Sequence, residues 1–287
     1  MMKARLTFLG TGTSSGVPML GCHCPVCESA DPRDTRLRAS ALVEYGSLTI
    51  LIDCGPDFRQ QAIRAGIEHL DGILLTHNHM DHVGGLDDTR ALNLCEGHPV
   101  NIYCESYVEK SLHITYPYAF SEPKYPGAPE WNLHIIDGKS PFRVRSNEAD
   151  ETLVWERGVG YHHISTLEHE VPSVEVIPIQ AYHHKDRKTS VLGYRFGNIA
   201  YLTDVNLLED CELDKLKGLD AVTLGCVKRT VHHSHFSLTE CLEMFEKIGA
   251  RESYITHLSH LLPPHAQLEK ELPKGVFPAW DTLTIEY

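Results

Sequence analysis

The hydrophobic positions of the chain fall into two series of short runs, separated by a stretch in which proline and charged residues interrupt any period. Runs rich in branched and aromatic residues predict strands. In the first series these runs are 5–10, 41–45, 48–53, 72–76 and 100–104. Apolar residues at helical spacing predict a helix at 57–65, which stops at Gly66, another at 81–94, and a third that ends near Pro117.

The second series begins after residue 172 and again contains both strand-like and helix-like hydrophobic runs. Its predicted strands are 174–179, 191–196, 199–203, 221–224, 253–256 and 283–287, and helical spacing marks 207–216. Ser237-Leu238-Thr239-Glu240 has the pattern of a capping box, in which a serine and a glutamate satisfy free N–H groups at a helix start, and this helix would run to Gly249. Both series predict an α/β sandwich of two halves, about 1–120 and 173–287, in one domain with an insertion at about 121–172.

Net charge and composition limit the kinds of partner that we expect for this protein. Lys and Arg number 26 against 39 Asp and Glu, so the formal net charge is −13. The segment 121–172 is itself net acidic, and we expect no nucleic acid partner because cationic side chains drive binding to phosphate backbones. No run approaches the ~18–20 apolar residues of a membrane span, so no membrane partner is expected. Nine cysteines, odd in number and mostly scattered, form a poor disulfide framework and indicate a reducing, cytoplasmic location.

Histidine is unusually frequent, with 19 residues. Four potential metal ligands stand within the six residues His77-Asn78-His79-Met80-Asp81-His82, directly after the predicted strand 72–76. A turn that follows a strand projects side chains beyond the end of a sheet, where ligands usually bind. Imidazole nitrogens and carboxylate oxygens suit Zn²⁺ and similar divalent ions. Further candidates follow later predicted strands, namely His183, Asp204 and His257. Together they favour a metal site over isolated hydrogen-bonded side chains.

A second cluster is Cys22-His23-Cys24-Pro25-Val26-Cys27. Three thiols at this spacing are typical of a zinc site in a protein of a reducing compartment. A structural zinc ion takes four ligands, so the fourth must come from elsewhere, and the alternative is that these are free thiols. The segment 10–16 has the glycine spacing G-x-G-x-x-x-G, which we interpret as a tight turn rather than a dinucleotide-binding loop.

On these residues the sequence resembles the metallo-β-lactamase superfamily, which carries a His-x-His-x-Asp-His motif and then a His, an Asp and a His on later strands. The resemblance covers most of the chain outside about 121–172. It implies a four-layer αβ/βα sandwich with two mixed β-sheets flanked by helices. It also implies two metal positions, one held by His77, His79 and His183 and the other by Asp81, His82 and His257, with Asp204 bridging both.

Two further residues, His184 and Asp53, bear on this ligand set. His184 follows His183 directly, so the ligand is either of the two. Asp53 ends the predicted strand 48–53 and matches the superfamily's early aspartate, which implies that it orients the ligand loop through hydrogen bonds.

Two further segments are similar to one subgroup, the phosphoribosyl 1,2-cyclic phosphate phosphodiesterases. These are the Cys-x-Cys-x-x-Cys pattern after the first strand and Thr256-His257-Leu258-Ser259-His260 near the C-terminus. The resemblance implies that His260 completes a structural zinc site with Cys22, Cys24 and Cys27. It also implies a catalytic role for His235, just before the predicted capped helix, with His232 and His233 as alternatives.

The resemblance thus implies two divalent metal ions in the active site, zinc or manganese, and one structural zinc ion. Two aspartates against two divalent ions leave the centre positive, so we expect a small anionic substrate, a phosphodiester, attacked by a metal-activated hydroxide. The alternatives are a superfamily hydrolase that acts on a thioester, a lactone or a tRNA 3′ end, and a metal-bearing binding protein without turnover. The sequence leaves a homodimer open.

Overall fold

Two mixed β-sheets form the centre of the protein. The computed structural model describes residues 3–147, 151–156, 160–165 and 171–287, with only the backbone described for 151–156 and 160–165. The first sheet has the order β17-β1-β2-β3-β4-β5-β6. Its strands are β1 (Ala4–Gly10), β2 (Ser40–Tyr45), β3 (Leu48–Ile52), β4 (Gly72–Leu74), β5 (Val100–Cys104), β6 (Trp131–Ile135) and β17 (Thr284–Glu286).

The second sheet is built mainly from the C-terminal part of the chain, in the order β13-β10-β11-β12-β14-β15-β16. Its strands are β10 (Ser173–Tyr182), β11 (Ser190–Phe196), β12 (Ile199–Leu202), β13 (Leu207–Leu208), β14 (Ala221–Gly225), β15 (Glu252–Thr256) and β16 (Val276–Pro278). Strands β12, β14, β15 and β16 run parallel, whereas β10 and β11 are antiparallel. The last strand, β17, returns to the first sheet and pairs with β1, so both ends of the chain meet there.

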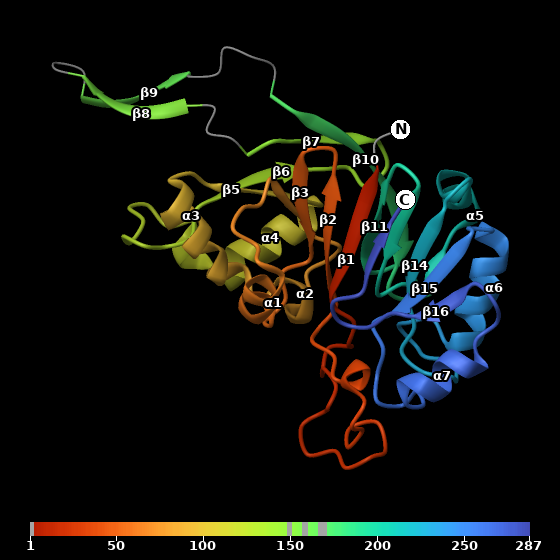
Figure 1. Cartoon of the computed structure of the whole chain (residues 1–287). Coiled ribbons are helices and arrows are strands. Elements are labelled where there is room, and N and C mark those ends of the chain that lie inside the picture. The colour runs from red at the N-terminus through yellow and green to blue at the C-terminus, as the bar shows by residue number, and fades with distance from the viewer. Residues whose placement is uncertain (1–2, 148–150, 157–159, 166–170) are drawn as a thin grey trace.

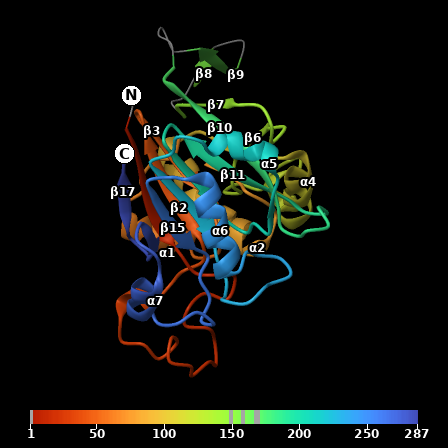
Figure 2. The same ribbon diagram turned by 90° about the vertical axis from the view of Figure 1, so that its right-hand side faces the viewer.

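Helices cover the outer face of each sheet (Figure 1). On the first sheet lie α1 (Phe58–Ala65), α2 (Met80–Val83), α3 (Arg90–Glu96) and α4 (Ser106–Thr115). On the second lie α5 (Asp210–Leu213), α6 (Leu238–Ile248) and α7 (His265–Glu271), and Figure 2 shows α6 in front of the strands. The predicted four-layer αβ/βα sandwich is confirmed.

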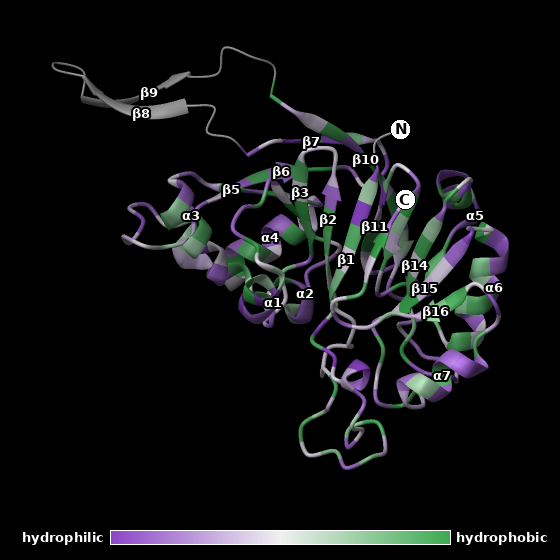
Figure 3. Ribbon diagram, viewed as in Figure 1, coloured by the Kyte–Doolittle hydropathy of each residue, from purple (hydrophilic) through white to green (hydrophobic). Residues whose placement is uncertain are grey.

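The core lies between the two sheets, where inward-facing residues of both sheets pack together. Phe8 of β1 contacts Tyr201 and Tyr254 of the second sheet, with ring centroids 6.3 and 6.0 Å apart. Separate apolar clusters lie under the helices of each side. Figure 3 shows green hydrophobic residues along the strands of both sheets, and a mixture of green and purple residues on the helices beside them. Burial of this apolar area is the main force that holds the layers together.

Two predicted helices are wrong in part. The segment 81–94 is not one helix, because α2 ends before Gly84 and a 3-10 turn at Leu86–Thr89 precedes α3. A side chain at Gly85 would collide with the carbonyl oxygen of Gly55, so this approach breaks the helix and demands glycine. The segment 207–216 begins with β13, since Leu207 and Leu208 pair with β10 before the short α5 starts. The sequence reasoning identified neither α7 nor β16.

The predicted insertion contributes to both sheets. β6 lies beside β5 in the first sheet, and β7 (Phe142–Arg145) pairs with β10 of the second. A separate two-stranded sheet follows, formed by β8 (Glu151–Glu156) and β9 (Gly160–Ser165). Residues 148–150, 157–159 and 166–170 of the predicted insertion lie outside the described residues. Among the described helices, none has both the length and the apolar composition that crossing a bilayer requires.

Candidate metal centre

The candidate ligands converge at one end of the sandwich because each follows a strand of one of the two sheets. The segment 77–82 follows β4 and enters α2, while His183, Asp204 and His257 follow β10, β12 and β15. A backbone hydrogen bond from Leu192 of β11 to Thr76 joins the two sheets at this point (3.0 Å). The site therefore forms only when both sheets are in place.

The first group consists of His77, His79 and His183, which offer ligand atoms within 4.8 Å of one another. The ring centroids of His79 lie 4.5 Å from His77 and 4.8 Å from His183. Three convergent imidazoles are a common donor set for divalent transition metals. His184 is outside this group, because its Nδ1 faces the carbonyl oxygen of His233 at 3.3 Å. Of the two alternatives left open by the sequence, the geometry therefore favours His183.

The second group consists of Asp81, His82, Asp204 and His257. His82 Nε2 lies 3.2 Å from Asp81 Oδ2 and 3.1 Å from Asp204 Oδ2, and His257 Nε2 lies 3.3 Å from the same Asp204 oxygen. Asp204 also belongs to a third set, with His183 and His235. It thus stands between the two groups, where a carboxylate can contact both metal positions.

Hydrogen bonds behind the ligands fix which ring nitrogen faces the site. His82 donates from Nδ1 to Oδ2 of Asp53 (2.7 Å), and Asp53 also accepts from the backbone N–H and the hydroxyl of Thr76. His183 donates from Nδ1 to the carbonyl oxygen of Ser234 (2.6 Å). A metal ion at the centre would bind the Nε2 lone pair of each ring, which is the arrangement of metal-binding imidazoles.

The donor set fits a cation. Over the residues that the structure describes, the buried Nε2 atoms of His77, His82 and His257 have no hydrogen-bond partner. Buried polar atoms are normally paired, and an orphan costs free energy unless another group satisfies it. A divalent cation at each group would satisfy these nitrogens and the carboxylates together.

The charges of the site agree with this fit. Burial lowers the pKa of His77 well below its usual value and that of His183 to about 4, so both rings are neutral. Burial also acts against the charged form of His82, but the carboxylates of Asp204, Asp53 and Asp81 outweigh it and raise the pKa of His82. The carboxylates therefore demand a positive charge at this point, which a metal ion would provide.

Three site residues hold an uncommon backbone conformation. Asp53, Asp204 and His257 have φ values of 60°, 57° and 56°, in the left-handed region that residues other than glycine rarely adopt. Such strain persists where the surrounding structure over-determines it and is concentrated at functional sites. The backbone at Gly55 lies close to the backbone of Asp81, so that a side chain at position 55 would collide with it.

His235 lies against the second group, with a side chain that is 12% exposed. Its Nδ1 is 3.6 Å from Asp204 Oδ1, and its ring stacks on His257 with centroids 5.0 Å apart. The capping box that starts α6 is present as predicted, with Ser237 and Glu240 exchanging hydrogen bonds. Burial lowers the pKa of His235 to about 2, so the ring is neutral and donates from one nitrogen only.

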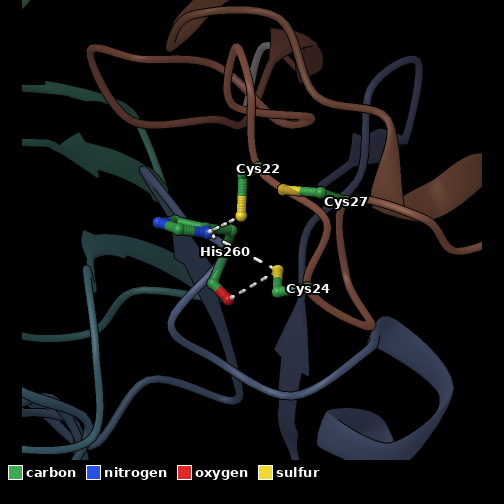
Figure 4. Close-up of side chains that lie close together, drawn as sticks. All are labelled: Cys22, Cys24, Cys27 and His260. Atoms are coloured by element: carbon green, nitrogen blue, oxygen red, sulfur yellow. Dashed lines mark hydrogen bonds between the residues drawn. The ribbon is translucent and has the colours of Figure 1, made fainter.

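The cysteine cluster is a second, separate donor set (Figure 4). Cys22, Cys24, Cys27 and His260 offer ligand atoms within 4.8 Å of one another, and His260 Nδ1 lies 3.1 Å from Cys22 Sγ and 3.5 Å from Cys24 Sγ. The backbone N–H of Cys27 lowers the pKa of Cys24 to about 6, whereas burial raises that of Cys27 to about 11. Three thiols and one imidazole form a Cys₃His set typical of structural zinc.

The structure thus brings together the residues expected at the metal centre, and those expected at the cysteine cluster. The sequence reasoning missed the residues that orient them, namely Thr76, Ser234 and Asn206. Ser234 accepts a hydrogen bond from His183 with its backbone carbonyl oxygen. Because every residue type has this group, the pattern of side chains in the sequence does not predict the contact.

Comparison with known proteins shows the family to which the chain belongs. A sequence model of the β-lactamase superfamily domain matches residues 49–258. The chain is 37% identical, over 97% of its length, to a protein of Porphyromonas gingivalis named octanoyltransferase, and spans about half (51%) of that relative. It is 34% identical to a diphosphatase of the PhnP family, whose crystal structure superposes with a TM-score of 0.81 and coverage of 100% of this chain and 98% of the other.

Zn²⁺-bound PqqB of Methylobacterium extorquens is 19% identical, with a TM-score of 0.64 and coverage of 98% and 99%, which is a likeness of fold. The family match spans most of the chain, including the 77–82 ligand segment, His183, Asp204 and His257. The chain therefore belongs to the β-lactamase superfamily and has its fold, and it carries groups of His and Asp side chains that could hold metal ions.

Proposed function

We propose that the protein is a dinuclear metal-dependent phosphodiesterase that acts on small phosphodiesters, cyclic ones included. The observation that carries this proposal is the position of His235. Its ring stacks on His257, its Nδ1 lies 3.6 Å from Asp204 Oδ1, and it shares a candidate donor group with His183 and Asp204. The 34% identity to a PhnP-family diphosphatase over the whole chain supports phosphorus chemistry.

Charge explains why an acidic protein would take an anionic substrate. The formal net charge is −13, yet the proposed ligand set contains only two carboxylates, Asp81 and Asp204, and its other members are histidines. Two divalent cations at these groups would leave the centre positive. A phosphodiester would then be attracted to the site although the rest of the surface is acidic.

Divalent metal ions held by these residues would polarise a phosphoryl oxygen and supply a nucleophile at neutral pH. The chain's own contribution is orientation and one hydrogen bond. Asp53 and Ser234 hold His82 and His183 with Nε2 toward the centre. His235, kept neutral by burial, would donate its ring N–H to the leaving oxygen as the P–O bond breaks and negative charge develops there. Water adds its hydroxyl to phosphorus and its proton to the leaving oxygen, so His235 ends unchanged.

The metals are part of the proposal. We assign zinc or manganese to the His/Asp centre, since such donor sets take several divalent ions according to availability. We assign zinc to Cys22, Cys24, Cys27 and His260, because thiolates select this metal and four protein ligands leave no open position for a substrate. This ion would tie the loop between β1 and β2 to the segment after β15.

A second candidate function is hydrolysis of an acyl thioester, favoured by the relative named octanoyltransferase. One panel separates the candidates. Metal-stripped protein is reloaded with Zn²⁺ or Mn²⁺ and assayed on a ribose 1,2-cyclic phosphate, bis(p-nitrophenyl) phosphate, an octanoyl thioester, a lactone, a β-lactam and a tRNA precursor. Metal-dependent turnover of the phosphodiesters supports the proposal. Turnover of the thioester alone would replace it, and no turnover of any substrate would favour a binding protein.

A further inference from the structure

His257 is held at the metal centre in a different way from the ligands opposite it. Nδ1 of His82 and Nδ1 of His183 each have a hydrogen-bond partner that fixes the direction of the ring. Nδ1 of His257 is buried and has no hydrogen-bond partner among the residues that the structure describes. The direction of this ring therefore depends on its backbone, which has a φ of 56° and needs support from its surroundings.

That support comes from the short segment directly after β1. Leu258 donates its backbone N–H to the carbonyl oxygen of Thr11 (2.8 Å), and its own carbonyl oxygen accepts from the backbone N–H of Thr13 (3.1 Å). Gly12, between these two threonines, pairs with Leu258 as in a parallel sheet. The two hydrogen bonds fix the peptide groups on both sides of Leu258, including the one that joins it to His257.

The segment that holds Leu258 is itself fixed from a third part of the chain. The backbone N–H and the hydroxyl of Thr11 both donate to Oδ1 of Asp281 (2.9 and 2.8 Å). The backbone N–H of Leu37 donates to the other oxygen of Asp281 (2.9 Å), whose side chain is only 7% exposed. The position of Leu258 thus depends on a carboxylate that belongs to neither metal group.

Two residues farther along, the same segment enters the cysteine cluster. Ser259 donates from its hydroxyl to the carbonyl oxygen of Val227 (2.6 Å), and His260 places Nδ1 between Cys22 and Cys24 (Figure 4). The four residues 257–260 therefore carry a candidate ligand of the His/Asp centre at one end and a ligand of the cysteine cluster at the other. The loop between β1 and β2 contacts this segment both at its second residue and at its last.

We propose that the loop between β1 and β2 positions His257, so that zinc in the cysteine cluster strengthens metal binding by the group of Asp81, His82, Asp204 and His257. The inference rests on the metal ions of the proposed function, but not on its substrate. A side chain that already has its binding orientation loses little conformational entropy when the metal ion arrives. Without zinc, His260 is no longer tied to the loop, and the left-handed backbone at His257 is free to relax.

The test measures metal affinity rather than turnover, in a double-mutant cycle. Protein with one zinc ion per chain, at the cysteine cluster, is titrated with Mn²⁺, and free Mn²⁺ is measured by electron paramagnetic resonance. Cys24→Ser, which lacks that zinc ion, should bind one of its Mn²⁺ ions about tenfold more weakly than the wild type. In a His257→Ala background, Cys24→Ser should change Mn²⁺ affinity by less than about twofold, because the residue through which it acts is already absent.

Rescue and control variants separate positioning from a general effect on the fold. Cys24→His keeps four zinc ligands in a Cys₂His₂ set, so it should retain the zinc ion and restore Mn²⁺ affinity. Cys211→Ser, at an exposed thiol, should leave both unchanged. Asp281→Asn keeps every ligand of the cluster but sets an amide N–H₂ against the N–H groups of Thr11 or Leu37, so it should also weaken Mn²⁺ binding about tenfold. Asp214→Asn is its exposed control.

Unchanged Mn²⁺ affinity in Cys24→Ser, with its zinc ion lost, would overturn the proposal. An equal loss in the wild-type and His257→Ala backgrounds would also overturn it, since the effect would then not pass through His257. If Cys24→Ser does not fold, Asp281→Asn decides, and unchanged affinity there counts against the proposal. Mn²⁺ binding that depends on Cys24, in a protein that hydrolyses no phosphodiester, would overturn the proposed function and leave the positioning role intact. A wild type that takes up no Mn²⁺ would overturn both.

Discussion

His82 donates a hydrogen bond from Nδ1 to Oδ2 of Asp53 across 2.7 Å, and both side chains are fully buried. This contact links the end of β3 to the start of α2 and turns Nε2 of His82 toward Asp81 and Asp204. Asp53 reaches this position with a left-handed backbone. The geometry of the site thus depends on such hydrogen bonds behind the candidate ligands as much as on the candidate ligands themselves.

Asp53→Asn should weaken metal binding at the His/Asp centre by about 10- to 100-fold, the range typical of groups that orient ligands. The amide of asparagine would place N–H donors against the N–H groups of Thr76 or His82, so one of these hydrogen bonds is lost. Competition with a chromophoric chelator measures the affinity. Asp214→Asn, at an exposed carboxylate, is the control. Equal affinity in Asp53→Asn and the wild type would show that Asp53 does not orient His82.

His235→Ala should lower kcat on a phosphodiester by about 10²- to 10³-fold, the usual loss when one donor to a developing charge is removed. Bound metal, measured by elemental analysis, should stay the same, because His235 is proposed as a donor rather than a ligand. His113→Ala provides the matched control. If His235→Ala loses metal in proportion to activity, His235 is a metal ligand and not only a donor. Its position within one candidate donor group with His183 and Asp204 would be compatible with that result.

Cys24→Ser should remove one zinc ion per chain and lower the melting temperature by at least about 5 °C, because a structural zinc site contributes directly to folding. The ion would join the loop that contains Cys22, Cys24 and Cys27 to the segment that carries His260, close to His257. The control is Cys211→Ser, at an exposed thiol of α5. Zinc content equal to that of the wild type would mean that the cluster is a set of free thiols.

His69 gives a pH dependence at the opposite end of β4. Burial acts against its charged form, but Asp71 and Glu96, each 3.1 Å from a ring nitrogen, outweigh it and raise the pKa of His69 above 6.5. A raised folded-state pKa means that the charged pair stabilises the fold below pH 6.5, and that this contribution is lost as the pH rises through the folded-state pKa. The ring is partly exposed, so we expect less than about 1 kcal/mol.

His69→Gln tests this dependence through urea unfolding at pH 5.5 and pH 9. The difference in free energy of unfolding between wild type and variant should be larger at pH 5.5 than at pH 9. His113→Gln should show no such change between the two pH values. A difference that grows with pH would show that charged His69 does not stabilise the fold.

The clustering of the candidate ligands could be predicted from the sequence because each candidate ligand segment follows a hydrophobic run that proved to be a strand. His77, His183 and Asp204 lie close together since the strand ends lie close together. The incorrect predictions concern features that depend on contacts between segments far apart in the sequence, which a local pattern does not reveal. The helix predicted at 81–94 is interrupted because Gly85 packs against Gly55, about thirty residues earlier. The choice between His183 and His184 depends on the backbone of Ser234, to which no sequence pattern points.

The segment 121–172 shows the same limit. Its prolines and charges interrupt the pattern, although the apolar run 133–136 predicts a strand that overlaps β6, which lies beside β5 in the first sheet. The sequence does not predict β7, because this short strand depends on hydrogen bonds to β10, about thirty residues later.

The most direct test of the central claim is hydrolysis of a cyclic phosphodiester in ¹⁸O-labelled water, followed by ³¹P NMR, with Asp204→Asn as the paired variant. We expect a metal-dependent phosphomonoester product with one ¹⁸O on phosphorus for the wild type, and at most a trace for Asp204→Asn, which lacks the carboxylate between the two candidate metal groups. An unchanged phosphodiester in the presence of Zn²⁺ or Mn²⁺, with an octanoyl thioester hydrolysed under the same conditions, would contradict it.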